Sequence, residues 1–445
     1  MRQGYRLGIG LIVAVLFAVQ HAVQLLLSGS RRTFLGDVVS LAFVAAVAEF
    51  STMALGRRIA RRPAGTDERV STATVFAIAT VLLVLDLFAK VLSPYLATQR
   101  QPPPTIPLLV VVGLWLAVIG IAARRPRDAE RWCMIGLIGL IFGTRVLVLW
   151  VSPFDRLTGD MLPVIDRGLG DLFAGRFPYL NYPPPMPYLS GMFLAYVPPK
   201  LLNIDIRITN LILDVIAAFV VMRFSPRPAG REGTGERGFA LDQLALPFFM
   251  LHPPWIYYSV NTQFSPCLFA TALLGRAITT AGPRLQALTL GFAVGSNQML
   301  VALGPILFGY WLANHGWRRA FALSALAAGV FLAMIAPFLL WNPWQFVNVA
   351  FMSRGEFSDA LMSGRFTILP PLRRLIPFAS PILSIFAMGI AAFAATRGRR
   401  PESVVAAMAI GLCAVLLVQP VSFSHYFLPV IVLAAIATGD SGTNP

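Results

Sequence analysis

The chain has 445 residues, of which 57% are hydrophobic and only 13% are charged, and its formal net charge at pH 7 is +16. Soluble globular proteins carry about 25% charged residues, so this composition excludes an ordinary soluble enzyme. Apolar runs close to the length of a membrane span recur along the chain, without the alternation of β-barrel strands. We therefore predict a polytopic, all-α membrane protein.

The positive charge lies mainly in short loops, which mark the cytoplasmic side of a membrane protein rather than a nucleic-acid partner. The predicted inner segments are residues 56–69, 123–131, 223–237, 316–319 and 397–400. The predicted spans lie near residues 7–28, 34–54, 71–93, 105–123, 132–152, 206–224, 239–258, 265–280, 285–314 (a tight pair), 319–341, 375–396, 402–418 and 421–438. These make about fourteen spans, with the C-terminus inside and two large outer loops at residues 153–205 and 342–373.

Five charged residues fall inside predicted spans: Glu49, Asp86, Lys90, Arg145 and Asp214. Charges in lipid are costly and mark either ion and substrate paths or structural pairs. Asp86 and Lys90 are four residues apart and are predicted to pair on one helix face. The three cysteines form no Cys-x-x-Cys or Cys/His cluster, so we predict neither a disulfide framework nor a zinc site.

The first outer loop contains "DRGLGDLFAGRF", which has helical spacing. A helix here would place Ile165, Leu169, Leu172 and Phe173 on one face, as expected for a helix lying in the membrane interface. The proline run at 183–185 sets a turn, because proline cannot continue a helix interior. The following "MPYLSGMFLAYVPPK" is predicted to form a second short interfacial helix.

The same loop carries several aspartates. Asp166 and Asp171 are predicted to pair with Arg167 and Arg176, as surface charges commonly do. Asp160 differs, because it follows a glycine and precedes the apolar "MLPVI". A partly desolvated carboxylate there would accept a proton from a hydroxyl, although a helix N-cap explains the residue equally well.

The order of these elements resembles the GT-C superfamily of polytopic glycosyltransferases, and more narrowly the bacterial polyprenol-phosphate-mannose-dependent mannosyltransferases. The resembling elements are Asp160, then Gly175–Pro178–Tyr179, then Tyr182–Pro183–Pro184. Residues 252–269 resemble the outer turn of that family, with Thr262–Gln263 as its polar pair. Residues 419–430 resemble a late motif, here Ser422, Ser424, His425 and Tyr426. The chain departs from the pattern at Pro163–Val164, where a tyrosine is usual, and at "GSNQ" (295–298), near which a lysine is common.

The resemblance implies a GT-C-type bundle with interfacial helices in its first outer loop. It divides the chain into N-terminal transmembrane helices (residues 1–131), a GT-C-like core (residues 132–438) and a cytoplasmic tail (residues 439–445). It also implies a multi-pass plasma-membrane enzyme that takes a hexose, mannose first, from a polyprenyl-phosphate donor to a glycan or glycolipid outside the cell. Arabinose and glucose remain alternative sugars, and a transporter, lipid flippase or membrane assembly factor remains an alternative function.

The resemblance makes Asp160 the general base that takes the proton of the acceptor hydroxyl. Cations would stabilise the leaving lipid phosphate; the candidates are Lys200, Arg207, Arg354, Arg365, Arg373 and Arg374. Substrate contacts would come from Tyr179, Tyr182, Asn261, Gln263, His425 and Tyr426. Simpler roles stay open: Arg207 can be neutralised by Asp205, Arg373 and Arg374 can anchor a helix end, and His425 can be a packing residue.

A divalent metal usually takes one or two carboxylates together with substrate phosphates. No second acidic residue adjoins Asp160, and only Glu356 and Asp359 in the second outer loop offer a distant ligand. We therefore predict metal-independent transfer and no cofactor, with a divalent metal as the less favoured alternative. The predicted partners are the lipid-linked sugar, its acceptor and the membrane lipids, with no nucleic acid.

Overall fold

The computed structural model describes residues 69–92, 105–125, 128–151, 154, 161–179, 188–223, 238–240, 247, 250–251, 259–352, 379–397, 400–418 and 424–439. Within these residues the chain is almost entirely helical, and the predicted all-α class is confirmed. The described strands are β1 (Arg69–Ser71) and β2 (Gly238–Ala240), which pair antiparallel.

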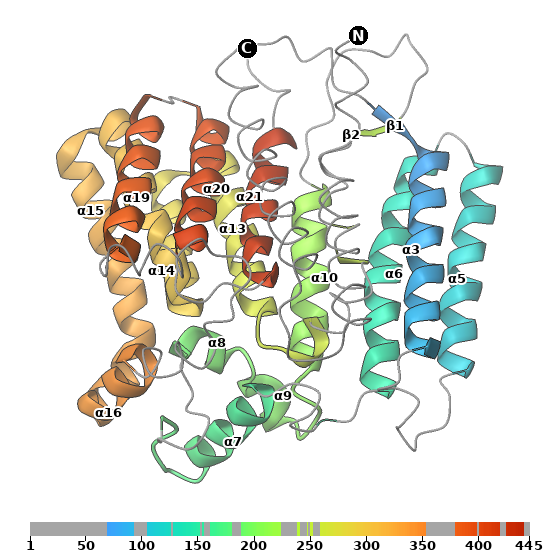
Figure 1. Ribbon diagram of the computed structural model, residues 1–445, viewed down its shortest axis with the longest axis horizontal. Coiled ribbons are helices and arrows are strands. Elements are labelled where there is room, and N and C mark those ends of the chain that lie inside the picture. Colours follow the sequence, from blue (N-terminus) through green and yellow to red (C-terminus); the bar gives the residue numbers. More distant parts are fainter. Residues whose placement is uncertain are drawn as a thin grey trace.

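Long helices stand side by side in one bundle (Figure 1). In chain order they are α3 (Thr72–Leu92), α5 (Thr105–Arg124), α6 (Ala129–Val151), α10 (Ile208–Arg223), α13 (Ser265–Thr280), α14 (Pro283–Ser296), α15 (Leu303–Trp341), α19 (Ala379–Arg397), α20 (Pro401–Val418) and α21 (Leu428–Gly439). Inside α15 the backbone leaves the helical region at Gly316, where φ is 76° and ψ is 165°. Glycine adopts this left-handed conformation without steric cost, so α15 is two helices joined at the predicted inner turn.

The two ends of the bundle differ. The β1–β2 ribbon lies at the end opposite to the short helices α7 (Met161–Phe173), α8 (Ser190–Leu194), α9 (Val197–Leu201) and α16 (Pro343–Val347) (Figure 1). β1 and β2 directly follow two segments that the charge pattern predicts to be cytoplasmic. The short helices belong to the two predicted outer loops. We therefore call the end with α7, α8, α9 and α16 the outer end.

Two helical stretches, Arg131–Trp150 and Gln298–Trp341, are long and apolar enough to cross a membrane, and further apolar helices are shorter. Large apolar side chains also face outward: Leu109 is 69% exposed and Ile385 is 67% exposed. Large apolar side chains exposed along long helices fit lipid better than water. The number of about fourteen spans stays a prediction, because those near residues 7–28 and 34–54, and most of 239–258, lie outside the described residues.

The predicted interfacial helix α7 buries Leu162, Ile165 and Leu169 in the main hydrophobic core. Leu172 packs partly against the core, and Phe173, the last residue of the helix, is 45% exposed. The second interfacial helix is instead two short ones, α8 and α9. Pro198 lies in the first turn of α9, where the backbone N–H that proline lacks would have no hydrogen-bond partner within the helix.

Glycines let α8 approach the core closely. An added Cβ on Gly191 would lie 2.5 Å from the carbonyl oxygen of Gly295 in α14. The hydroxyl of Ser190 donates a hydrogen bond to the carbonyl of Met334 in α15, at 2.7 Å. The first outer loop is therefore joined to the main bundle at a close backbone contact.

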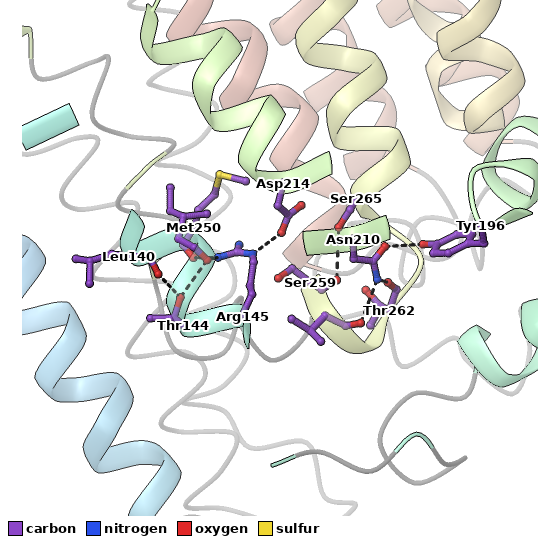
Figure 2. A network of polar contacts seen from close by, with 12 residues as sticks. Leu140, Thr144, Arg145, Tyr196, Asn210, Asp214, Met250, Ser259, Thr262 and Ser265 are labelled. Atoms are coloured by element: carbon purple, nitrogen blue, oxygen red, sulfur yellow. Dashed lines mark hydrogen bonds and ion pairs between the residues drawn. The ribbon is translucent and has the colours of Figure 1, made fainter. Parts of the chain in front are cut away.

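A buried ion pair joins α6 to α10. The guanidinium Nε of Arg145 lies 2.7 Å from Oδ2 of Asp214, and neither side chain is exposed (Figure 2). Arg145 also donates hydrogen bonds to the carbonyls of Ile141 and Met250. Two of the predicted intramembrane charges thus pair with each other, whereas Glu49 and the side chains of Asp86 and Lys90 lie outside the described residues.

Candidate functional site

The turn that precedes α13, residues 259–264, lies near the outer end of the bundle and carries the polar pair singled out in the sequence. The side chain of Asn210, on α10, binds the main chain of this turn. The side-chain Nδ2 of Asn210 donates hydrogen bonds to the carbonyls of Val260 at 3.1 Å and Thr262 at 2.6 Å (Figure 2). The hydroxyl of Tyr196 donates to Oδ1 of Asn210 at 2.6 Å. Asn210 thus connects the α8–α9 link to the turn.

Arg207, one residue before α10, is only 4% exposed. Its Nε and Nη2 donate to both carboxylate oxygens of Asp205, with the shortest distance 2.6 Å. Its Nη1 donates to Oδ1 of Asn261 at 3.2 Å, and its guanidinium lies 5.5 Å from the ring centre of Phe154. The charge of Arg207 is therefore neutralised by Asp205, the simpler of its two predicted roles. The same guanidinium also orients Asn261.

Gln263 and Thr262 carry buried oxygens without a protein partner. The Nε2 of Gln263 donates to the hydroxyl of Tyr188 at 2.6 Å, but within the described part of the chain neither its Oε1 nor Oγ1 of Thr262 has a hydrogen-bond partner. A buried acceptor without a partner costs about 1–3 kcal/mol. Two such atoms on adjacent residues favour a site where water or ligand hydroxyls complete the bonding.

Tyr426 brings the late motif to the same turn. Its ring stacks on Phe264, with ring centres 5.7 Å apart and an interplanar angle of 19°. Tyr426 belongs to the short 3-10 helix Ser424–Phe427, so His425 is adjacent to this stack in the chain. The side chain of His425 lies outside the described residues. The two motifs are more than 150 positions apart, so only the fold brings them together.

Lys200 on α9 forms an ion pair with Asp166 on α7, with Nζ 2.7 Å from Oδ1. We predicted that Asp166 and Asp171 pair with Arg167 and Arg176; the structure adds Lys200 as a partner of Asp166, because α9 packs against α7. Arg176 does pair with Asp171, at 2.6 Å, as predicted. The side chain of Lys200 is 30% exposed, so it can still reach an anion at the outer end.

Tyr179 lies in a cluster of aromatic rings. Its ring is fully buried and meets Phe193, Phe338 and Phe346, with centres 6.2, 5.3 and 4.8 Å away. These rings come from α8, the end of α15 and α16, so Tyr179 joins both outer loops. The hydroxyl of Tyr179 has no hydrogen-bond partner. Burial raises the pKa of this hydroxyl, so it stays protonated.

Several predicted site residues lie outside the described residues: Asp160, Tyr182, Arg354, Arg365, Arg373 and Arg374, together with Glu356 and Asp359. Asp160 immediately precedes α7 in the chain, and α7 lies at the outer end. Within the described residues, no group of three or more His, Cys, Asp or Glu side chains could hold a metal ion. Metal-independent transfer stays a prediction.

Asn210, Tyr196 and Tyr188 were not identified from the sequence. A signal existed for Asn210, because Arg207, Asn210 and Asp214 recur at intervals of three and four residues, which is one face of a helix. A polar stripe of this kind in an apolar span points to buried hydrogen-bond partners. No comparable signal marks Tyr188, whose link to Gln263 crosses 75 positions.

The family model of Glycosyltransferase family 87 matches residues 179–420. This region is more than half of the chain, so the chain belongs to glycosyltransferase family 87. No match was found among curated proteins or among solved structures. The matched region includes Tyr179, the turn at residues 259–264 and all helices from α8 to α20. Together with the apolar helices, it supports a membrane glycosyltransferase of the GT-C type.

Proposed function

We propose that this member of glycosyltransferase family 87 transfers a hexose, mannose in the first instance, from a polyprenyl-phosphate donor. The acceptor is a glycan or glycolipid on the extracytoplasmic side of the plasma membrane. The observation that carries the proposal is the pair of buried, unpartnered oxygens on Thr262 and Gln263. These acceptors suit sugar hydroxyls, and they lie within the region that matches the family.

The location supports a lipid-linked donor. The isoprenoid chain of such a donor stays in the bilayer, while its sugar phosphate lies at the surface. The turn at residues 259–264 and the short helices α7, α8 and α9 lie near the same end of a bundle whose long helices expose apolar side chains (Figure 1). In the proposed complex, the donor sugar reaches these polar acceptors while its phosphate stays at the membrane surface.

In the proposed reaction, the oxygen of the acceptor hydroxyl attacks the anomeric carbon of the donor. The bond from that carbon to the phosphate oxygen breaks, and its electron pair leaves with the polyprenyl phosphate. Asp160 takes the proton from the attacking hydroxyl. If the configuration at the anomeric carbon is inverted, a β-linked donor gives an α-linked product.

Cations stabilise the leaving phosphate as its charge grows. Among the described candidates, Lys200 fits this role better than Arg207, because Lys200 is 30% exposed whereas Arg207 is 4% exposed and held by Asp205. Arg354, Arg373 and Arg374 in the second outer loop complete the proposed set. Asn261, Gln263, His425 and Tyr426 hold the sugar, with Tyr179 and Tyr182 on the outer-loop side.

The test uses membranes that contain the full chain, radiolabelled polyprenyl-phospho-mannose and a lipid extract as acceptor. The Asp160→Asn variant should lose at least about a hundredfold in transfer, the usual contribution of a general base. Asp155→Asn, in the same loop, is the matched control and should retain transfer. Equal activity of wild type and Asp160→Asn would remove Asp160 as the base. Transfer only from glucose- or arabinose-linked donors would replace mannose as the proposed donor sugar. A transmembrane flux of lipid or solute without sugar transfer would reject the proposal that the protein is a glycosyltransferase of this kind.

A further inference from the structure

Three polar residues form a stripe along the outer half of α10 and the residue before it. Arg207, Asn210 and Asp214 all have less than a tenth of their surface exposed. Arg207 donates to the side chain of Asn261, and Asn210 donates to main-chain carbonyls on both sides of Asn261. Arg207 and Asn210, the two residues of this stripe nearest the outer end, are therefore directed at one short turn of the chain.

Asn210 forms hydrogen bonds with the backbone of the turn. Its two bonds reach the carbonyls of Val260 and Thr262, so the backbone on either side of Asn261 is fixed relative to α10. A local link at the same turn is weaker, because the hydroxyl of Ser265 lies 3.4 Å from the carbonyl of Ser259. Hydrogen bonds of that length are at the limit of useful geometry.

Tyr196 sets the orientation of the Asn210 amide. Its hydroxyl donates to Oδ1 of Asn210 at 2.6 Å, which leaves Nδ2 directed at the turn (Figure 2). Tyr196 is fully buried in the link between α8 and α9. Burial raises the pKa of Tyr196, and the nearby Asp214 carboxylate raises it further, so the hydroxyl keeps its proton and remains a donor.

The unpartnered oxygens lie on the residues that Asn210 holds. Thr262 contributes its main-chain carbonyl to Asn210 and carries the free Oγ1, and Gln263 with its free Oε1 is the next residue. Their positions in space are thus set by a bond to a residue that presents no free polar atom of its own to a ligand. A catalytic turn needs this kind of support, because loosely held groups lose most of their binding geometry.

We propose that Asn210 is a positioning residue that fixes the turn at residues 259–264, so that Thr262 and Gln263 present their oxygens to the hydroxyls of the donor sugar. Tyr196 acts with it by orienting the amide. This inference rests on the proposed function, because it names the sugar donor as the ligand of the turn. Asn210 itself does not touch the substrate.

The decisive variant is Asn210→Leu, which has a similar size but no donor or acceptor. Thr209→Val is the matched control, because Thr209 is the neighbouring buried residue and its hydroxyl bonds to Ala195 rather than to the turn. Both variants would be made in the full chain and assayed in membranes for KM and kcat of the lipid-linked sugar. Amide hydrogen exchange over residues 259–264 would be measured on purified protein in detergent.

We expect Asn210→Leu to raise KM for the donor about tenfold, the equivalent of one well-placed hydrogen bond. Amide exchange at residues 259–264 should increase, and Thr209→Val should match the wild type in both measurements. Because Asn210 acts through Thr262 and Gln263, the KM of the double variant Asn210→Leu, Gln263→Ala should rise by less than the two single effects combined. Tyr196→Phe should raise both KM and exchange to a smaller extent.

Wild-type KM or unchanged exchange in Asn210→Leu would overturn the inference, and so would additive effects in the double variant. If Asn210→Leu fails to fold, Tyr196→Phe decides the matter, because it keeps the ring and removes only the hydroxyl. Wild-type exchange and KM in Tyr196→Phe would then count against the inference. Failure of the wild type to transfer sugar would reject the proposed function instead, while the exchange measurement would still show whether Asn210 holds the turn.

Discussion

Arg145 on α6 and Asp214 on α10 form an ion pair with 2.7 Å between Nε and Oδ2, and neither side chain is exposed. Asp214 lies within the region that matches glycosyltransferase family 87, and Arg145 lies before it. The second carboxylate oxygen of Asp214 and Nη2 of Arg145 have no hydrogen-bond partner. The pair therefore joins helices from two parts of the chain at the cost of incompletely satisfied polar atoms.

Removing one member of this pair should destabilise the protein strongly. Arg145→Leu leaves the Asp214 carboxylate buried and unpaired, which typically costs about 3–5 kcal/mol. The double variant Arg145→Leu, Asp214→Leu should regain much of that loss, because neither charge is then left alone. Thermal unfolding in detergent measures both. Lys200→Met, which breaks the partly exposed pair with Asp166, is the control and should change the melting temperature less.

Gln263 should affect donor binding more than stability. Gln263→Leu removes the unpartnered Oε1, which offsets the lost bond to Tyr188, so we expect a nearly unchanged melting temperature. The KM for the lipid-linked sugar should rise about tenfold for one lost contact. Gln286→Leu is the contrasting variant, because Gln286 is equally buried but accepts a bond from Trp311 at 2.9 Å. Gln286→Leu should lower the melting temperature and leave KM unchanged. A lower melting temperature with unchanged KM in Gln263→Leu would argue against Gln263 as a ligand residue.

The ring of Tyr179 should matter for stability, and its hydroxyl for transfer. Tyr179→Phe keeps the contacts to Phe193, Phe338 and Phe346 and removes a hydroxyl without a protein partner, so stability should be retained or slightly raised. Tyr179→Ala should cost about 3–5 kcal/mol, as for other large aromatic deletions. We expect Tyr179→Phe to lower sugar transfer while unfolding at the wild-type temperature. Full activity in Tyr179→Phe would show that the hydroxyl does not meet the substrate.

The crossing of α14 and α15 should not tolerate an added methyl group. A Cβ on Gly291 would collide with the carbonyl of Ala327 and lie 2.7 Å from Cβ of Val330. Gly291→Ala should therefore destabilise the protein by about 1–3 kcal/mol through overpacking. Gly329→Ala on α15 is the control, because nothing lies within 4 Å of its added Cβ. Its higher helix propensity should leave stability unchanged or raise it.

The site was only partly predictable from the sequence. The polar pair Thr262–Gln263 and the late motif with Tyr426 were identified by resemblance, and the fold places Phe264 and Tyr426 in a stack. Asn210 and Tyr188 were missed, although both bond to that turn. Their importance depends on which backbone carbonyl or amide lies opposite, and a linear pattern contains no such information. Lys200 was expected at a phosphate, and the packing of α9 on α7 adds an ion pair with Asp166.

By itself the sequence determined that this is an all-helical, lipid-facing protein and which loops share an end, because hydropathy and loop charge act locally on each segment. The tertiary structure alone decided the partners: Arg145 with Asp214 across 69 positions, and Gln263 with Tyr188 across 75. A buried polar group bonds to whatever the neighbouring helix places within about 3 Å, and that neighbour is set by packing rather than by distance along the chain.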